Sequence, residues 1–85
     1  MRQIILDESH FDYEDILAKN KVDVIKAYDS EWYLSWGHGV INIGPTTELF
    51  ARKSAAMFVQ LWLLGVAAPL AKTLMKGYLV WLEKQ

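Results

Sequence analysis

Six side chains near the start of the chain have the chemistry of a metal site. Carboxylates and one imidazole are concentrated there, at Asp7, Glu8, His10, Asp12, Glu14 and Asp15. Groups of this kind bind cations when they converge on one point. Their spacing fits no calcium loop, and no second histidine lies at helical spacing from His10. Acidic residues also favour the first turn of a helix, where they complement its dipole. We therefore expect an acidic helix start, with no metal and no cofactor.

The chain also contains serine and histidine, the residue types of a hydrolytic triad. None of the serines lies in a nucleophile-elbow pattern, and Ser9 is better explained as a helix cap. His38 lies between Gly37 and Gly39, which indicates a turn, and these glycines match no phosphate-loop pattern. The absence of cysteine excludes thiol catalysis, disulfides and cysteine-bound metal. We expect a protein that is not an enzyme.

Charge is spread unevenly along the chain, although the net charge is only −1. Residues 1–31 carry eight acids and four bases, whereas residues 32–85 carry five bases and two acids. A thin basic face and a slightly negative total disfavour nucleic-acid binding. The acidic first half could instead imitate a nucleic-acid backbone toward a basic partner, and we keep this as one alternative. The other interpretation is that the two halves face each other or are solvated.

Alternating and β-branched residues predict strands in the first half, with one helix among them. That helix is expected to begin at a Ser9 cap and to end near Asn20, anchored by Phe11, Ile16 and Leu17. Asp29-Ser30 and Gly37–Gly39 are expected to form turns. Trp32, Leu34 and Trp36 would then share one strand face. The expected strands are Gln3–Leu6, Val22–Tyr28, Glu31–Trp36 and Val40–Ile43.

The second half predicts two helices joined at Gly65–Pro69. Thr46 or Thr47 can cap the first, with Glu48 in its opening turn. Its apolar side is expected to contain Phe50, Ser54, Met57, Phe58, Leu61 and Trp62. The second helix is expected to begin near Ala68-Pro69, since proline is tolerated in a first turn. Its apolar face is expected to contain Leu70, Leu74, Tyr78 and Trp81, flanked by Met75 and Leu82.

Ser54 to Ala71 carries no charged residue, which meets the minimum length for a membrane span. Gln60, Gly65 and Pro69 interrupt this stretch, and the apolar positions follow a helical period on each side of the glycine–proline turn. Basic residues flank both ends, so no orientation is favoured. A buried helical hairpin is our preferred interpretation, and a membrane-associated protein that uses this stretch is the alternative.

Together these elements predict an α+β fold in the order β-α-β-β-β-α-α. A small antiparallel or mixed sheet of three or four strands would be covered on one face by the C-terminal helical hairpin. Eighty-five residues correspond to one domain, 1–85, and 53% hydrophobic residues are enough for it to fold. The N-terminus lacks the pattern of a signal peptide, so we expect a cytoplasmic protein.

A small domain with no catalytic constellation favours a binding function. We expect a module that docks on a partner protein and inhibits or modulates it, as small inhibitors encoded by phages or mobile elements do. A homodimer is a further interpretation, because it would cover an apolar stripe that a monomer exposes. The expected contact residues lie among the charges of the first hairpin helix or on the far face of the sheet: Leu49, Arg52, Val59, Leu63 and Tyr33.

Overall fold

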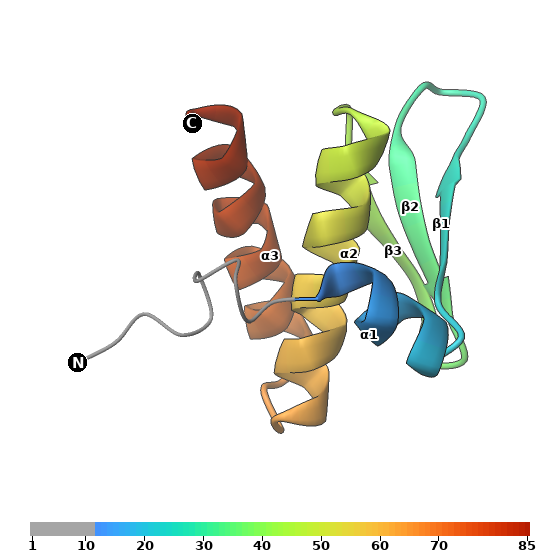
Figure 1. Cartoon of the computed structure of the whole chain (residues 1–85), viewed down its shortest axis with the longest axis vertical. Helices are drawn as coiled ribbons and strands as arrows, with labels where there is room; N and C mark the ends of the chain where they lie inside the picture. Colours follow the sequence, from blue (N-terminus) through green and yellow to red (C-terminus); the bar gives the residue numbers. More distant parts are fainter. Residues whose placement is uncertain (1–11) are drawn as a thin grey trace.

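The computed structural model describes residues 12–85 (Figure 1). This part of the chain is an α+β domain with a three-stranded sheet and three helices, as the sequence predicted. The expected strand at Gln3–Leu6 lies outside the described residues. The elements are α1 (Tyr13–Lys19), β1 (Asp23–Lys26), β2 (Trp32–Trp36), β3 (Gly39–Gly44), α2 (Glu48–Leu63) and α3 (Ala68–Glu83).

The sheet is antiparallel throughout, in the order β1-β2-β3. The loop between β1 and β2 is closed without glycine. Ser30 takes the left-handed conformation at φ 67°, and the Glu31 amide donates to Asp29 Oδ1 over 3.0 Å. This is the turn expected at Asp29-Ser30. A tighter turn at Gly37-His38 joins β2 to β3, and there Gly39 supplies a φ of 133°.

Helix α2 is the element on which the others pack (Figure 1). It lies on the inner face of the sheet, where Leu34 and Ile43 are almost fully buried and Trp32 and Trp36 pack against the core. Helix α1 crosses α2 on another side, and α3 runs antiparallel to α2. The hairpin therefore covers the sheet mainly through its first helix, while α3 packs mainly on α2 and reaches the sheet at β3.

Helix α1 begins later than the sequence predicted. Asp12 caps it, because Asp12 Oδ1 accepts a hydrogen bond from the Asp15 amide over 3.1 Å. The expected cap, Ser9, lies outside the described residues, as do His10 and the first acids of the cluster. The end of the helix at Asn20 and the burial of Leu17 are both confirmed. Competition between two capping residues, Ser9 and Asp12, explains the shift, since aspartate caps a helix as well as serine does.

The start of α2 and the turn between α2 and α3 both lie where the sequence predicted them. Thr47 caps α2 by accepting from the Phe50 amide over 3.2 Å. At the other end, the Val66 amide donates to Leu61 O and the Gly65 amide to Trp62 O, over 3.0 and 2.9 Å. This is a Schellman motif, and Gly65 provides its left-handed residue at φ 93°. Pro69 then lies in the first turn of α3.

The buried face of α3 agrees with the prediction at Met75, Tyr78 and Leu82 but differs from it elsewhere. Ala71, Met75, Leu79 and Leu82 are buried against α2 and the core, together with Tyr78. Leu70 and Leu74, which were expected on that face, are 55% and 45% exposed. Ala71 is fully buried at the contact with α2, and a small residue there allows the helices to approach closely. The larger side chains of Leu70 and Leu74 lie on an exposed side of the hairpin.

Candidate interaction surface

The five predicted contact residues do not form one site. Leu49 and Leu63 are 48% and 60% exposed, but they lie near opposite ends of α2. They are fourteen positions apart, which corresponds to about 21 Å along the helix. Tyr33 lies on the face of β2 opposite Leu34, because side chains alternate along a strand. Arg52 and Val59 are engaged within the fold. Of these positions, only Leu63 adjoins a larger apolar surface.

Val59 belongs to the core and is not available to a partner. Its exposure is 0%, although it lies among polar residues on the helical wheel of α2. Helix α1 packs against α2 in addition to the sheet and α3, so α2 is covered on three sides. The side that periodicity assigned to solvent is the side that α1 covers. Helical periodicity alone could not reveal this contact, because the partner helix is distant in sequence.

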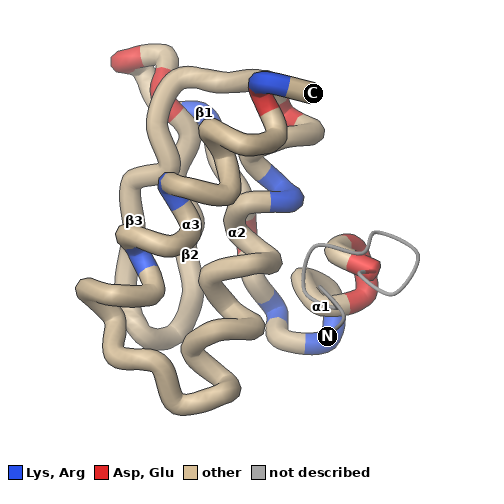
Figure 2. The backbone as a smooth tube through the Cα atoms, turned by 90° about the vertical axis from the view of Figure 1, so that its left-hand side faces the viewer, with Lys and Arg blue, Asp and Glu red and all other residues tan. Residues whose placement is uncertain are grey.

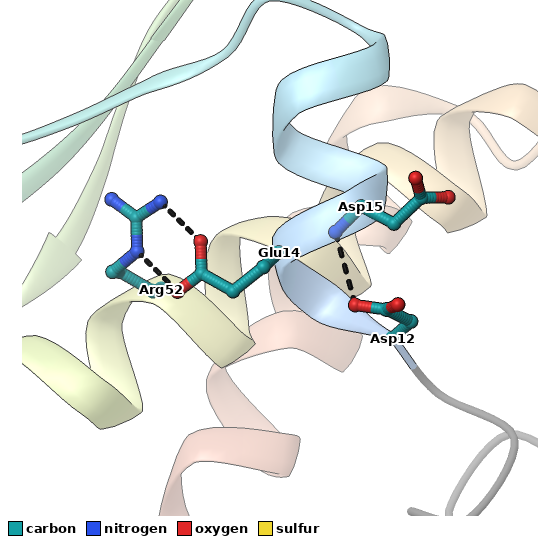
Figure 3. Close-up of polar contacts among 4 residues, drawn as sticks. All are labelled: Asp12, Glu14, Asp15 and Arg52. Atoms are coloured by element: carbon teal, nitrogen blue, oxygen red, sulfur yellow. Dashed lines mark hydrogen bonds and ion pairs between the residues drawn. The ribbon is translucent and has the colours of Figure 1, made fainter.

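Arg52 is held by α1 through an ion pair with Glu14 (Figure 3). Arg52 Nε and Nη2 donate to the two carboxylate oxygens of Glu14 over 2.9 and 2.6 Å. These hydrogen bonds lower the pKa of Glu14 below its ordinary value and raise the pKa of Arg52. A bidentate pair with both partners inside the chain makes Arg52 a fold contact. It also joins the acidic first part of the chain to the basic second part.

Tyr33 is likewise engaged by a neighbour. Its hydroxyl donates to Asp29 Oδ2 over 2.7 Å. This hydrogen bond raises the pKa of Tyr33 and lowers that of Asp29, which also accepts from the Glu31 amide. Asp29 is fixed by both contacts in the β1–β2 loop. The pair therefore supports the turn, and its two groups are too exposed to form an enclosed reactive site.

His38 lies against two indoles at the β2–β3 turn. Its ring centroid is 4.8 Å from that of Trp36 and 4.9 Å from that of Trp62. A cavity of about 150 Å³ opens beside these rings, and its other walls are apolar side chains such as Leu34, Ile41 and Phe58. Among the described residues, no acid, serine or second histidine lines this cavity. The walls of this cavity are thus mainly aromatic and aliphatic side chains.

An apolar surface continues from His38 onto the turn between α2 and α3. Leu63, Leu64 and Leu70 are 60%, 67% and 55% exposed. A hollow of about 350 Å³ lies beside them, lined by Trp62 and by residues 65–68. We call this region the hairpin-end surface; its residues are His38, Trp62, Leu63, Leu64, Val66 and Leu70.

The hairpin-end surface is free of acidic and basic residues. No Asp, Glu, Lys or Arg occurs in residues 32–47 or 54–71, the two stretches that build it. The turn between α2 and α3 is correspondingly uncoloured in the charge view, while acidic residues gather on α1 and at the β1–β2 end (Figure 2). Three exposed leucines therefore lie close together in sequence around a turn that carries no charged residue. Exposed apolar patches are typical of interaction sites.

Of the residues that form the hairpin-end surface, only Leu63 was predicted from the sequence as a contact residue. Leu64, Leu70 and Trp62 were missed as contact residues, because Leu70 and Trp62 were assigned to buried faces. The available signal was the turn itself. Residues at the tip of a two-helix turn have few neighbours, so large apolar side chains next to Gly65 are candidates for exposure.

Within residues 12–85, no group of three or more histidine, aspartate or glutamate side chains is placed to hold a metal ion. None of the helices in that range has both the length and the apolar character needed to cross a membrane. Comparison with protein-family models, with curated proteins and with solved structures gives no match to this chain.

Proposed function

We propose that this chain is a non-enzymatic binding module that docks on another protein through the hairpin-end surface. The observation that carries the proposal is the grouping of three half-exposed to mostly exposed leucines, at positions 63, 64 and 70, around the turn of a stretch, residues 54–71, that contains no Asp, Glu, Lys or Arg. Exposing such residues to water is unfavourable, by about 1.5–3 kcal/mol for each large apolar side chain relative to full burial. A partner that covers them recovers this free energy.

The shape and charge of the surface define the chemistry of the partner. The turn between α2 and α3 lies at one end of the molecule (Figure 1), and the three leucines around it are exposed, so they fit a hollow lined by apolar side chains. The cavity beside Trp36, His38 and Trp62 can in return accept one apolar side chain of the partner. Apolar and aromatic anchors at the centre of an interface carry most of the binding free energy in protein complexes.

A protein partner is favoured over a lipid bilayer by the absence of basic residues. Helices that lie at a membrane surface combine an apolar face with lysine and arginine, which attract anionic lipids. Here neither stretch that forms the hairpin-end surface contains lysine or arginine. The same absence argues against nucleic acid, whose phosphates require cationic contacts.

The test compares the full chain with a double variant, L63E/L70E. Immobilised wild-type protein is used to capture partners from a lysate of the source organism, and each captured protein is identified, purified and measured by calorimetry. We expect the dissociation constant to rise at least about tenfold in L63E/L70E, because charge at these positions opposes burial. V40E/V80E is the matched control, since Val40 and Val80 are 66% and 49% exposed and lie elsewhere.

Circular dichroism must first show that both variants keep the wild-type fold. A purified partner that binds L63E/L70E as tightly as wild type would refute the hairpin-end surface as the docking site. Sedimentation of wild type with phosphatidylcholine/phosphatidylserine vesicles, lost in L63E/L70E, would instead establish a lipid target. Dimerisation that L63E/L70E abolishes would identify a second copy as the partner.

A further inference from the structure

The cavity beside His38 is built from two pairs of side chains that face each other. Leu34 and Trp36 lie two positions apart on β2, so they point to the same face of the sheet. Phe58 and Trp62 lie four positions apart on α2, so they share one side of that helix. All four side chains line the cavity. Its walls are therefore fixed by a strand and a helix that pack on each other.

The lining of the cavity runs from the core to the molecular surface. Leu34 and Phe58 are 0% and 3% exposed. Trp62 and Ala68 are partly exposed, and His38 at the β2–β3 turn is exposed. A group that enters beside His38 can therefore reach buried side chains of the core.

The volume of the cavity, about 150 Å³, matches one six-membered ring. An engineered apolar cavity of about 150 Å³ takes up benzene, so this volume is sufficient for a single ring. Ala68 helps to create the space, because its methyl group is small and lies at the start of α3. A longer side chain at this position would fill the cavity.

The aromatic walls favour an aromatic ring over an aliphatic group of the same size. The ring pairs Trp36–His38, His38–Trp62 and Phe58–Trp62 have centroid distances of 4.8, 4.9 and 6.4 Å. The first is an edge contact at 81°, and the other two are tilted by 35° and 32°. The surrounding rings thus differ in orientation. A ring that enters among them gains edge-to-face or offset contacts in addition to the burial of its surface.

A neutral ring is favoured over a cation. Indole faces attract quaternary ammonium groups, so a cation is the natural competitor for this cavity. Among the described residues that line it, none carries a carboxylate. A bound cation would therefore leave water without a counter-ion, which is unfavourable in apolar surroundings.

We propose that this cavity binds one neutral aromatic ring of the size of benzene, supplied by a phenylalanine side chain of the docked partner. The ring follows from the volume and the lining. Its source in a protein rests on the proposed function, because the hairpin-end surface shares His38 and Trp62 with the cavity. Phenylalanine suits the lining because its ring needs no hydrogen-bond partner.

The test is an NMR titration of the full chain with N-acetylphenylalaninamide, and N-acetylleucinamide is the aliphatic comparison. We expect the phenylalanine probe to shift the Trp36 and Trp62 indole resonances saturably and to bind at least several-fold more tightly than the leucine probe. Ala68→Leu, which fills the cavity, should raise the dissociation constant of the phenylalanine probe at least about tenfold. Ala67→Leu is the matched control, since Ala67 is exposed and does not line the cavity. It should leave that constant within about twofold of the wild-type value.

A second measurement needs no variant. In the wild-type chain, we expect nuclear Overhauser contacts between the probe ring and the Ala68 methyl group, so the proposal stays testable if Ala68→Leu folds poorly. Absence of saturable shifts, equal affinity for the two probes, or unchanged affinity in folded Ala68→Leu would overturn the ring site. Tighter binding of tetramethylammonium than of toluene would overturn the preference for a neutral ring.

Toluene, which is the phenylalanine side chain without its backbone, distinguishes the two sources of a ring. Binding of toluene but not of N-acetylphenylalaninamide would overturn phenylalanine as the source and would indicate a free aromatic molecule. None of these measurements changes Leu63 or Leu70. If L63E/L70E failed to weaken partner binding, the proposed function would fall, while saturable toluene binding in the cavity would still establish the ring site.

Discussion

The Arg52 guanidinium contacts both carboxylate oxygens of Glu14, with N–O distances of 2.9 and 2.6 Å (Figure 3). This pair connects α1 to α2 at the surface, above the buried contact that Leu17 and Val59 help to form. The Glu14 side chain is about half exposed. Water therefore screens the pair, and its contribution to stability is small in spite of its good geometry. Apolar burial, and not this ion pair, fixes α1 on α2.

The Glu14→Gln variant should lower the free energy of unfolding by about 0.5 kcal/mol at neutral pH. The Arg52 hydrogen bonds lower the pKa of Glu14 in the folded state from its ordinary 4.5. The contribution of the carboxylate is therefore complete above the unfolded pKa and is lost as the pH falls through the folded pKa. Urea unfolding of wild type and variant across this range should show the two stabilities converging in acid.

The exposed Asp15–Lys19 pair, 3.2 Å apart within α1, provides the control. Lys19→Gln should change stability by less than about 0.5 kcal/mol, because solvent-exposed pairs of this spacing contribute little. A stability difference between wild type and Glu14→Gln that persisted unchanged in acid would mean that the side chain acts through packing and not through its charge.

Removal of the Ser54 hydroxyl should raise the free energy of unfolding, whereas the Glu14 substitution should lower it. Ser54 is 0% exposed, and its Oγ has no hydrogen-bond partner within the described part of the chain. An unsatisfied buried hydroxyl costs free energy, so Ser54→Ala should stabilise the fold by about 1 kcal/mol. In a domain of this size, thermal unfolding should shift upward by about 4–8 °C.

Ala55→Ser is the matched control for that experiment. Ala55 is also fully buried, on the next position of α2. A hydroxyl introduced there should destabilise the fold by about 1–3 kcal/mol, because it gains no partner. If Ser54→Ala lowered the melting temperature instead, the hydroxyl must be satisfied in solution, and an internal water would be the first group to look for by NMR.

Local signals in the sequence predicted the local structure well. Thr47 as a cap, the glycine–proline corner and the strand turn at Asp29-Ser30 all depend on residues within four positions of one another. The same signals failed for Ser9, where Asp12 competes as a cap within the same stretch. Periodicity predicted that each helix of the hairpin has an apolar side. It did not predict the burial of Ala71 in α3 or the exposure of Leu70 and Leu74, because these depend on close packing of the two helices.

The candidate site was harder to predict than the fold. Val59 and Leu63 have the same residue class and lie one turn apart on α2, yet Val59 is fully buried and Leu63 is 60% exposed. The difference arises from the packing of α1 and other elements around α2, and from the position of Leu63 at the end of that helix. Both causes are tertiary. Sequence spacing could therefore nominate apolar residues for a surface but could not separate the two.

The turn that presents Leu63 and Leu64 depends on Gly65. Its φ of 93° lies in the left-handed region, which costs a residue with a Cβ about 1–2 kcal/mol. A Cβ built at Gly65 meets no heavy atom within 4 Å, so steric crowding adds nothing to that cost. Gly65→Ala should therefore lower the free energy of unfolding by about 1 kcal/mol. Asparagine tolerates this conformation better, so Gly65→Asn should lose less.

Chemical denaturation of wild type and the two variants ranks them directly, and we expect wild type to be the most stable and Gly65→Ala the least. Gly77→Ala is the contrasting case, because Gly77 lies inside α3 and a Cβ there also meets no heavy atom within 4 Å. Alanine should raise stability at that position by about 0.5–1 kcal/mol, since glycine is a poor helix former. Equal effects at the two glycines would contradict the left-handed turn. The two hairpin helices would then join differently, and Leu63 and Leu64 would no longer be presented on a common surface.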